Sequence, residues 1–178
     1  LEFRLLFRSA QMKRTAVMGL LLALALILSY VESLIPLPIG IPGIKIGLAN
    51  LAVVLAMYLV GEKNALLLTI SKAVLSGLLF GNLTVILYNL AGALISFFTM
   101  ALMKKSGRFH LPVISAVGGA MHNTGQLLVA CVIVSTYGIV YYIPFLLIAG
   151  LGTGMVIGSV AVLVLPAARK GMNGGNRG

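Results

Sequence analysis

The feature that most constrains the fold is a long apolar segment, Ser115–Val134, which carries three polar side chains near its middle. It reads SAVGGAMHNTGQLLVACVIV, and as a helix it is long enough to cross the hydrocarbon core of a bilayer. Its polar residues are His122, Asn123 and Gln126, and polar groups at that depth need hydrogen-bonding partners or serve a function. His122 and Gln126 would lie one turn apart on one helix face, so the segment predicts a membrane helix whose polar side faces the protein interior.

Composition indicates that the whole chain lies in a membrane. Hydrophobic residues make up 60% of it, charged residues 9%, and the mean hydropathy is +1.11. A water-soluble domain of this size could not cover so much apolar surface. The apolar runs are continuous and lack the two-residue alternation of transmembrane strands, so the predicted fold class is an all-α integral membrane protein. Cys131 is the single cysteine, which excludes a disulfide framework or a multi-cysteine metal site within one chain.

Turn residues and charges divide the apolar sequence into a bundle of six predicted transmembrane helices. The predicted ranges are 15–35, 47–60, 65–79, 84–103, 115–134 and 144–165. They form a membrane domain of residues 14–166, between a basic segment 1–13, expected to be an interfacial helix or an irregular N-terminus, and a basic tail 167–178. The apolar loop 36–43 is rich in proline and glycine, and it is expected to fold back over the membrane domain as a cap.

The basic residues predict the orientation of this bundle. Most lie in the N-terminal segment, in the turn between the second and third predicted helices, in the loop between the fourth and fifth, and in the C-terminal tail. In the connections on the opposite side, Lys45 is the one basic residue. Positively charged connections stay in the cytoplasm, so both termini are predicted to be cytoplasmic and the proline-rich loop external. The net charge of +10 is explained by these membrane edges, and nucleic acid is not an expected partner.

Several polar residues within the predicted helices indicate a solute site. Lys72 lies mid-helix, where a lysine costs roughly 2.5 to 3.5 kcal/mol to insert, and this cost favours a functional role. His122 could serve the site or could hold helices together. The fourth helix is predicted to turn a stripe of Tyr88, Asn89, Gly92 and Ser96 inward. The candidate substrate-binding residues are Glu32, Lys45, Asn50, Lys72, Asn89, His122, Asn123 and Gln126.

The charges of this set indicate the kind of ligand. Lys45 and Lys72 outnumber the nearby Glu32, which predicts a small anionic or polyoxygenated molecule. The apolar walls around them would accept a ring or an isoprenoid tail.

The first helix carries small residues at four-residue spacing, which allows another helix to approach closely. That neighbour could belong to this chain's own bundle or to a partner subunit. The candidate partner-docking residues are Gly19, Ala23, Ala25 and Ser29.

Four segments resemble a known family in their order and spacing. They read LALILSYVESLIPLP, PGIKIGLANLAVVLAMYLVG, GAMHNTGQLLVA and YIPFLLIAGLGTGMVIG. They resemble the Gx transporter family, also called heptaprenyl diphosphate synthase component I, over residues 16 to about 165. That family is similar to the S components of energy-coupling factor (ECF) transporters, prokaryotic cell-membrane proteins.

The resemblance implies six helices and a solute site near the outer face, closed by the first external loop. It also implies docking through helix 1 onto a transmembrane coupling subunit driven by two ATPase subunits. The usual docking signature is Ala-xxx-Ala, whereas this chain has Gly19-xxx-Ala23 and Ala25-xxx-Ser29.

The acidic residues exclude prenyl transfer by the chain itself. A prenyl diphosphate synthase binds its substrate through magnesium ions held by aspartate-rich motifs. This chain has no aspartate, and Glu2, Glu32 and Glu62 are too scattered to hold a metal pair. A Walker A loop is also absent, so an ATP-driven cycle would need another subunit. We therefore expect no catalytic residues, no metal and no cofactor.

Two functions then remain open. The chain could be the solute-binding subunit of an importer, or a non-catalytic membrane accessory of isoprenoid, quinone or extracellular redox machinery.

Overall fold

The computed structural model describes residues 2–34, 47–134, 141 and 143–174, which form six helices and no strand. Five of the helices are long and apolar enough to cross a membrane, and α2 is shorter. The predicted all-α membrane bundle of six helices is therefore confirmed. The helices are α1 (Glu2–Leu34), α2 (Asn50–Leu59), α3 (Glu62–Phe80), α4 (Leu83–Ser106), α5 (Leu111–Val134) and α6 (Ile143–Gly174).

The ends of the first and last helices differ from the prediction. α1 begins at Glu2 and continues without a break into the membrane segment, because no glycine or proline interrupts it before Gly19. The prediction that α6 ends before Pro166 was wrong, since the helix continues to Gly174. Proline removes one backbone hydrogen bond, but its fixed φ is helical, and the loss falls near the end of this long helix.

The shorter boundary shifts have local causes. α2 begins at Asn50 instead of residue 47 because Gly47 adopts a φ of 89°, outside the helical region. α4 extends through Ser106, so Lys104 and Lys105 lie on the helix instead of in the predicted loop. Gly107 then ends α4 in the left-handed conformation that glycine favours, with a φ of 67°.

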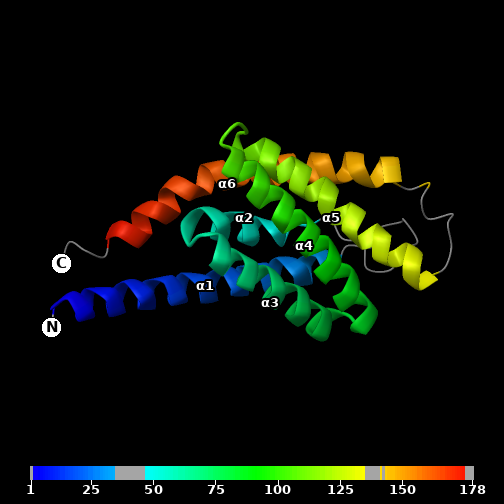
Figure 1. Cartoon of the computed structure of the whole chain (residues 1–178). Coiled ribbons are helices and arrows are strands. Elements are labelled where there is room, and N and C mark those ends of the chain that lie inside the picture. Colours follow the sequence, from blue (N-terminus) through cyan, green and yellow to red (C-terminus); the bar gives the residue numbers. More distant parts are fainter. Residues whose placement is uncertain (1, 35–46, 135–140, 142, 175–178) are drawn as a thin grey trace.

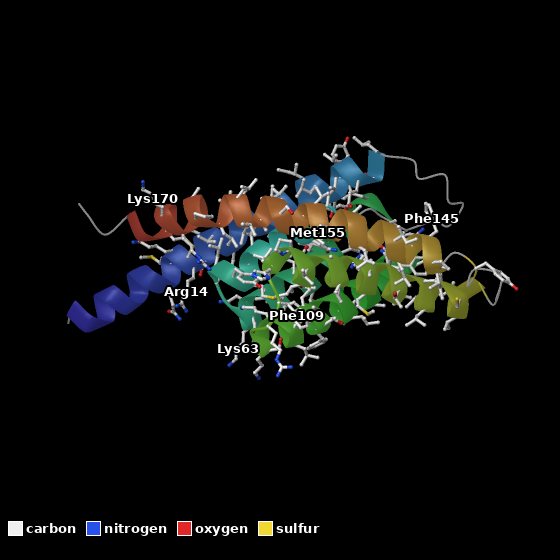
Figure 2. The ribbon with its side chains drawn as sticks, turned by 90° about the horizontal axis from the view of Figure 1, so that it is seen from above. Arg14, Lys63, Phe109, Phe145, Met155 and Lys170 are labelled. Atoms are coloured by element: carbon white, nitrogen blue, oxygen red, sulfur yellow. The ribbon has the colours of Figure 1, made fainter. Side chains whose placement is uncertain are left out.

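Figure 1 shows that α1 begins and α6 ends at the same end of the bundle. Basic side chains mark that end, and Arg14, Lys63 and Lys170 all lie toward it in Figure 2, away from Phe145 at the opposite end. Large apolar side chains such as Leu20, Val132 and Leu163 are exposed along the helices between the two ends. This distribution fits a protein whose sides face lipid.

Glycines bring α5 and α6 into backbone contact. A Cβ built on Gly119 would lie 2.2 Å from the carbonyl oxygen of Gly150, and one on Gly154 would lie 2.3 Å from that of Ser115. Side chains larger than hydrogen would force these helices apart. Of the four glycines in the middle of α6, Gly150, Gly154 and Gly158 make such close contacts with α5, whereas a Cβ on Gly152 would meet no atom within 4 Å.

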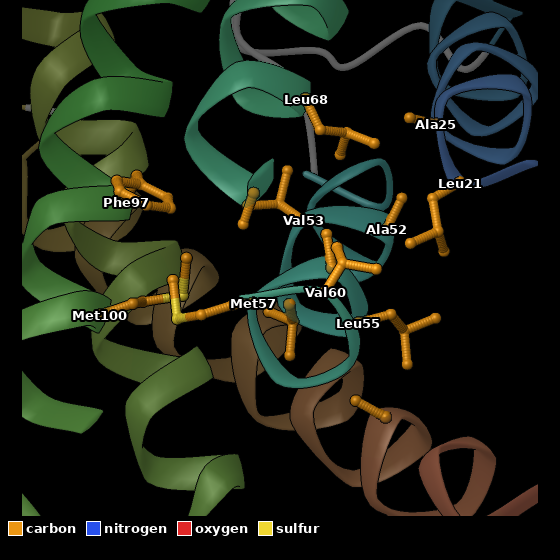
Figure 3. Packing of buried hydrophobic residues seen from close by; sticks show 14 of the residues in the cluster. Leu21, Ala25, Ala52, Val53, Leu55, Met57, Val60, Leu68, Phe97 and Met100 are labelled. Atoms are coloured by element: carbon orange, nitrogen blue, oxygen red, sulfur yellow. The ribbon is translucent and has the colours of Figure 1, made fainter. Parts of the chain in front are cut away.

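The apolar core lies around the short helix α2, as Figure 3 shows. Ala52 and Val53 pack between α1, represented by Leu21, and α3, represented by Leu68. Met57 is 1% exposed and reaches toward Met100 of α4. α2 is thus surrounded by other helices, which explains why so short a helix is stable.

Lys104 connects α4 to the end of α2. Its Nζ donates a hydrogen bond of 2.8 Å to the carbonyl oxygen of Met57, in the last turn of α2. The same ammonium lies 3.6 Å from Glu62 Oε1 and 5.0 Å from the centre of the Tyr58 ring. A lysine at a helix C-terminus satisfies carbonyls that lack partners and interacts favourably with the helix dipole. Lys104 therefore fixes the position of α2 against α3 and α4.

Candidate solute site

The polar residues of the bundle interior meet beside the N-terminal end of α2. Lys72 projects from the middle of α3, is 5% exposed, and donates a hydrogen bond of 2.7 Å from Nζ to Oδ1 of Asn50. Asn50 is the first residue of α2. The first residue of the short helix α2 is therefore the acceptor for the buried lysine of α3, and 22 residues of sequence separate the two.

A second set of hydrogen bonds links α3, α4 and α5. Asn89 Nδ2 donates to Ser76 Oγ at 3.3 Å, and Gln126 Nε2 donates to Asn89 Oδ1 at 3.5 Å. The predicted inward stripe of α4 is confirmed, because Tyr88, Asn89, Gly92 and Ser96 are all buried. Gly92 allows the close approach, since a Cβ there would lie 2.6 Å from the His122 carbonyl oxygen.

Asn123 links α5 to α6 through a side-chain hydrogen bond. Its Nδ2 donates a hydrogen bond of 2.9 Å to the carbonyl oxygen of Leu146, in the first turns of α6. This bond ties the two helices together near the end opposite the chain termini. The side chain is buried, and it also borders a cavity described below.

Glu32 lies at the far end of α1, where its Oε1 accepts a hydrogen bond from the backbone N–H of Leu48. This bond anchors the segment that leads into α2. Lys45 and the predicted cap loop 36–43 lie outside the described residues.

His122 stands between two small cavities, each of about 10 Å³. That volume is close to the minimum that holds one water molecule. One cavity lies on the side of Lys72 and is also bordered by Ser29, Glu32, Gly47, Ala49, Ser76 and Asn89. The other lies between α2, α4, α5 and α6, and its polar border consists of Asn50, Ser96, Ser115, Asn123 and Thr153.

The two cavities differ in charge. Lys72 and Glu32 border the first, whereas hydroxyl and amide groups border the second together with the imidazole. Within the part of the chain that the structure describes, Ser96 Oγ is buried without a hydrogen-bond partner. The site therefore combines a charged compartment and a neutral one on either side of His122.

Some residues at the site were not among the predicted ligand contacts. Ser76 follows Lys72 by one helical turn, and Ser96 and Ser115 belong to polar faces visible in the sequence. Thr153 had no signal of this kind, because it lies in a glycine-rich apolar helix. Ser29 was predicted to dock a partner, but it is 2% exposed and borders the Lys72 cavity.

The small residues of α1 separate into two faces. Ala25 and Ser29 are buried within the chain's own bundle, at 0% and 2% exposure. Gly19 and Ala23 are exposed, and a Cβ on Gly19 would meet no atom within 4 Å. Only Gly19 and Ala23 of the four predicted docking residues are accessible to a partner in this arrangement.

Comparison with known families agrees with this architecture. The sequence profile of the family described as heptaprenyl diphosphate synthase component I matches residues 21–164. The chain belongs to this family. The match spans α2 to α5 whole and includes every described candidate ligand residue. No curated protein and no solved structure matches the chain.

Membership of the heptaprenyl diphosphate synthase component I family confirms the resemblance seen in the four sequence segments. The family description names a component instead of a complete synthase. With five helices of membrane-spanning length, this family member is a multi-pass membrane protein.

Proposed function

We propose that this chain is the membrane-embedded solute-binding subunit of an ECF-type importer, for a small anionic or polyoxygenated molecule. The observation that carries the proposal is Lys72, a lysine buried mid-helix and bordering a cavity in the bundle interior together with His122. Ionisable groups inside a membrane bundle are costly, and they commonly mark substrate pathways.

The start of α2 supports an anionic ligand. Its N-cap residue, Ala49, provides no side-chain hydrogen bond to the first turn, and Ala49 borders the Lys72 cavity. The N-terminal end of a helix carries a partial positive charge. Half-helices whose N-termini point at anionic groups are a recurring way to bind substrates at the membrane midplane. Lys72 and the α2 terminus therefore add positive potential at one place, beside the carboxylate of Glu32, which borders the same cavity.

Binding requires the helices to separate. Each cavity has a volume of about 10 Å³, whereas sites for small organic ligands usually occupy about 300–1,000 Å³. The hydrogen bond between Asn89 and Ser76 crosses from α4 to α3 and is long, at 3.3 Å. A ligand that entered beside Lys72 would replace this bond and push α3 away from α4.

The importer would depend on other subunits for energy. The chain has no Walker A loop, so we propose that a transmembrane coupling subunit with two ATPase subunits drives transport, and that the chain is not itself an enzyme. The exposed face of α1 around Gly19 and Ala23 is the proposed docking surface. The proposed location is a prokaryotic cell membrane.

The family description favours one alternative function. As a member of a family described as heptaprenyl diphosphate synthase component I, the chain could be a non-catalytic membrane accessory of isoprenoid or quinone biosynthesis. In that case the buried polar groups would serve helix packing.

Purification of the full chain from its native membrane in mild detergent separates the two functions. The proposal predicts a tightly retained small molecule, detected by mass spectrometry after denaturation, and co-purification with ATPase subunits. Stable co-purification with a prenyl diphosphate synthase, without a retained small molecule, would support the accessory function and contradict the importer.

A further inference from the structure

A second site lies on the lipid-facing side of the bundle, apart from the polar interior. An open groove of about 490 Å³ runs between α1 and α6, with α2 at its base. In Figure 1, α1 and α6 lie on either side of α2 toward the end where α1 begins. The walls are apolar, formed chiefly by Leu20, Leu24, Leu55, Leu59, Val164 and Met172.

One end of this α1–α6 groove is basic. Lys13 borders it directly, and Arg169 and Lys170 flank the bordering residues Ala168 and Gly171. The groove thus joins an apolar wall to a positively charged end.

The length of the groove matches one leaflet of a bilayer. From Lys13 to Leu24 the rise along α1 is about 16 Å, at about 1.5 Å per residue. Half of the hydrocarbon thickness of a bilayer is about 15 Å. A lipid whose headgroup lies beside Lys13 would therefore keep its chain within the groove to the middle of the membrane.

The two parts of the groove match the two parts of an anionic lipid, since its walls are apolar and Lys13 borders one end. We propose that the groove binds one anionic phospholipid of the cytoplasmic leaflet, with an acyl chain along the apolar walls and the phosphate beside Lys13. The proposal does not depend on the importer function.

Native mass spectrometry of the purified full chain tests the headgroup. With phosphatidylglycerol and phosphatidylcholine of identical acyl chains, we expect the anionic lipid to bind about fivefold more tightly, the scale of one lysine contact at a membrane surface. Lys13→Gln should remove this preference. Lys63→Gln, which removes an exposed cation on α3, should leave it unchanged. Equal binding of the two lipids, or a preference that survives Lys13→Gln, would overturn the assignment.

A groove-filling variant tests the position of the acyl chain. A Cβ on Gly171 meets no atom within 4 Å, so Gly171→Leu should fold and place its side chain in the groove. It should abolish the retained phosphatidylglycerol, whereas Ala167→Leu, on an exposed neighbouring residue, should not. Lipid retained by Gly171→Leu would overturn the proposal. Displacement of phosphatidylglycerol by equimolar farnesyl diphosphate would overturn it in favour of a prenyl diphosphate.

Discussion

At the scale of single residues, Lys72 connects the stability of the protein to its proposed function. Its ammonium is buried and donates a hydrogen bond to the amide oxygen of Asn50, which is a neutral acceptor. An amide oxygen solvates a charge without neutralising it. We propose that a negative group of the ligand binds beside this ammonium, and the carboxylate of Glu32 borders the same cavity.

Lys72→Met keeps the length of the side chain and removes the charge. We expect the apparent melting temperature to stay close to the parent's, because removal of a desolvated charge offsets the lost hydrogen bond to Asn50. Binding of the retained molecule should weaken by about 2 kcal/mol or more, the scale for truncating one member of a buried charged pair. Isothermal titration calorimetry with the identified ligand measures this change.

The matched variant is Glu32→Gln. If Lys72→Met and Glu32→Gln unfold the protein to the same extent, the two residues form a structural pair. The ligand would then have to bind elsewhere, and the proposed role of Lys72 would be wrong.

Ser96 gives a prediction about the neutral cavity. Its hydroxyl has no partner among the described residues and borders a cavity of about 10 Å³, enough for one water molecule. We expect a bound water there, so that Ser96→Ala removes one of its partners and lowers stability by about 1 kcal/mol. The control is Ser159→Ala, on an exposed face of α6. Differential scanning fluorimetry gives the sign, and a higher melting temperature for Ser96→Ala would show that the cavity is dry.

At the scale of whole helices, α1 divides its small residues between two tasks. Ala25 and Ser29 let α1 pack against its own bundle, whereas Gly19 and Ala23 leave a smooth exposed face. The pair Ala25 and Ser29 thus contacts the chain's own helices. The pair Gly19 and Ala23, with the same four-residue spacing, lies on the side of α1 that a partner subunit could contact.

Gly19→Leu tests the external contact. A side chain at this position meets no other part of the chain, so the variant should fold and bind its small molecule as the parent does. It should fail to co-purify with a coupling subunit, because leucine fills the surface where another helix would approach. Ala25→Leu, at a fully buried residue, should instead lower stability and ligand binding together. Normal assembly by the Gly19→Leu variant would remove the docking role of this face.

At the scale of the whole molecule, the sequence predicted the elements better than their connections. Hydropathy and turn residues located six helices, and the inward stripe from Tyr88 to Ser96 followed from helical periodicity. The pairing of Lys72 with Asn50 could not be predicted, since it depends on how α2 and α3 meet in space. The bond from Lys104 to the end of α2 was missed for the same reason. The last helix was predicted to end at residue 165 because proline commonly ends a helix, whereas α6 continues through Pro166 to Gly174.

The shortness of α2 also has an electrical consequence. Ten residues rise about 15 Å, so, with the predicted cytoplasmic position of both termini, α2 would begin near the middle of the membrane. A solute that enters from outside and stops beside Asn50 would therefore cross about half of the membrane potential. Crossing the full potential of 100 mV is worth about 2.3 kcal/mol per charge, so crossing half of it is worth about 1.2 kcal/mol. The cell interior is negative, so a monoanion should bind about sevenfold more weakly in vesicles energised to 100 mV than in unpolarised ones. A neutral ligand would show no such dependence, and radioligand binding with and without an imposed potassium gradient distinguishes the two.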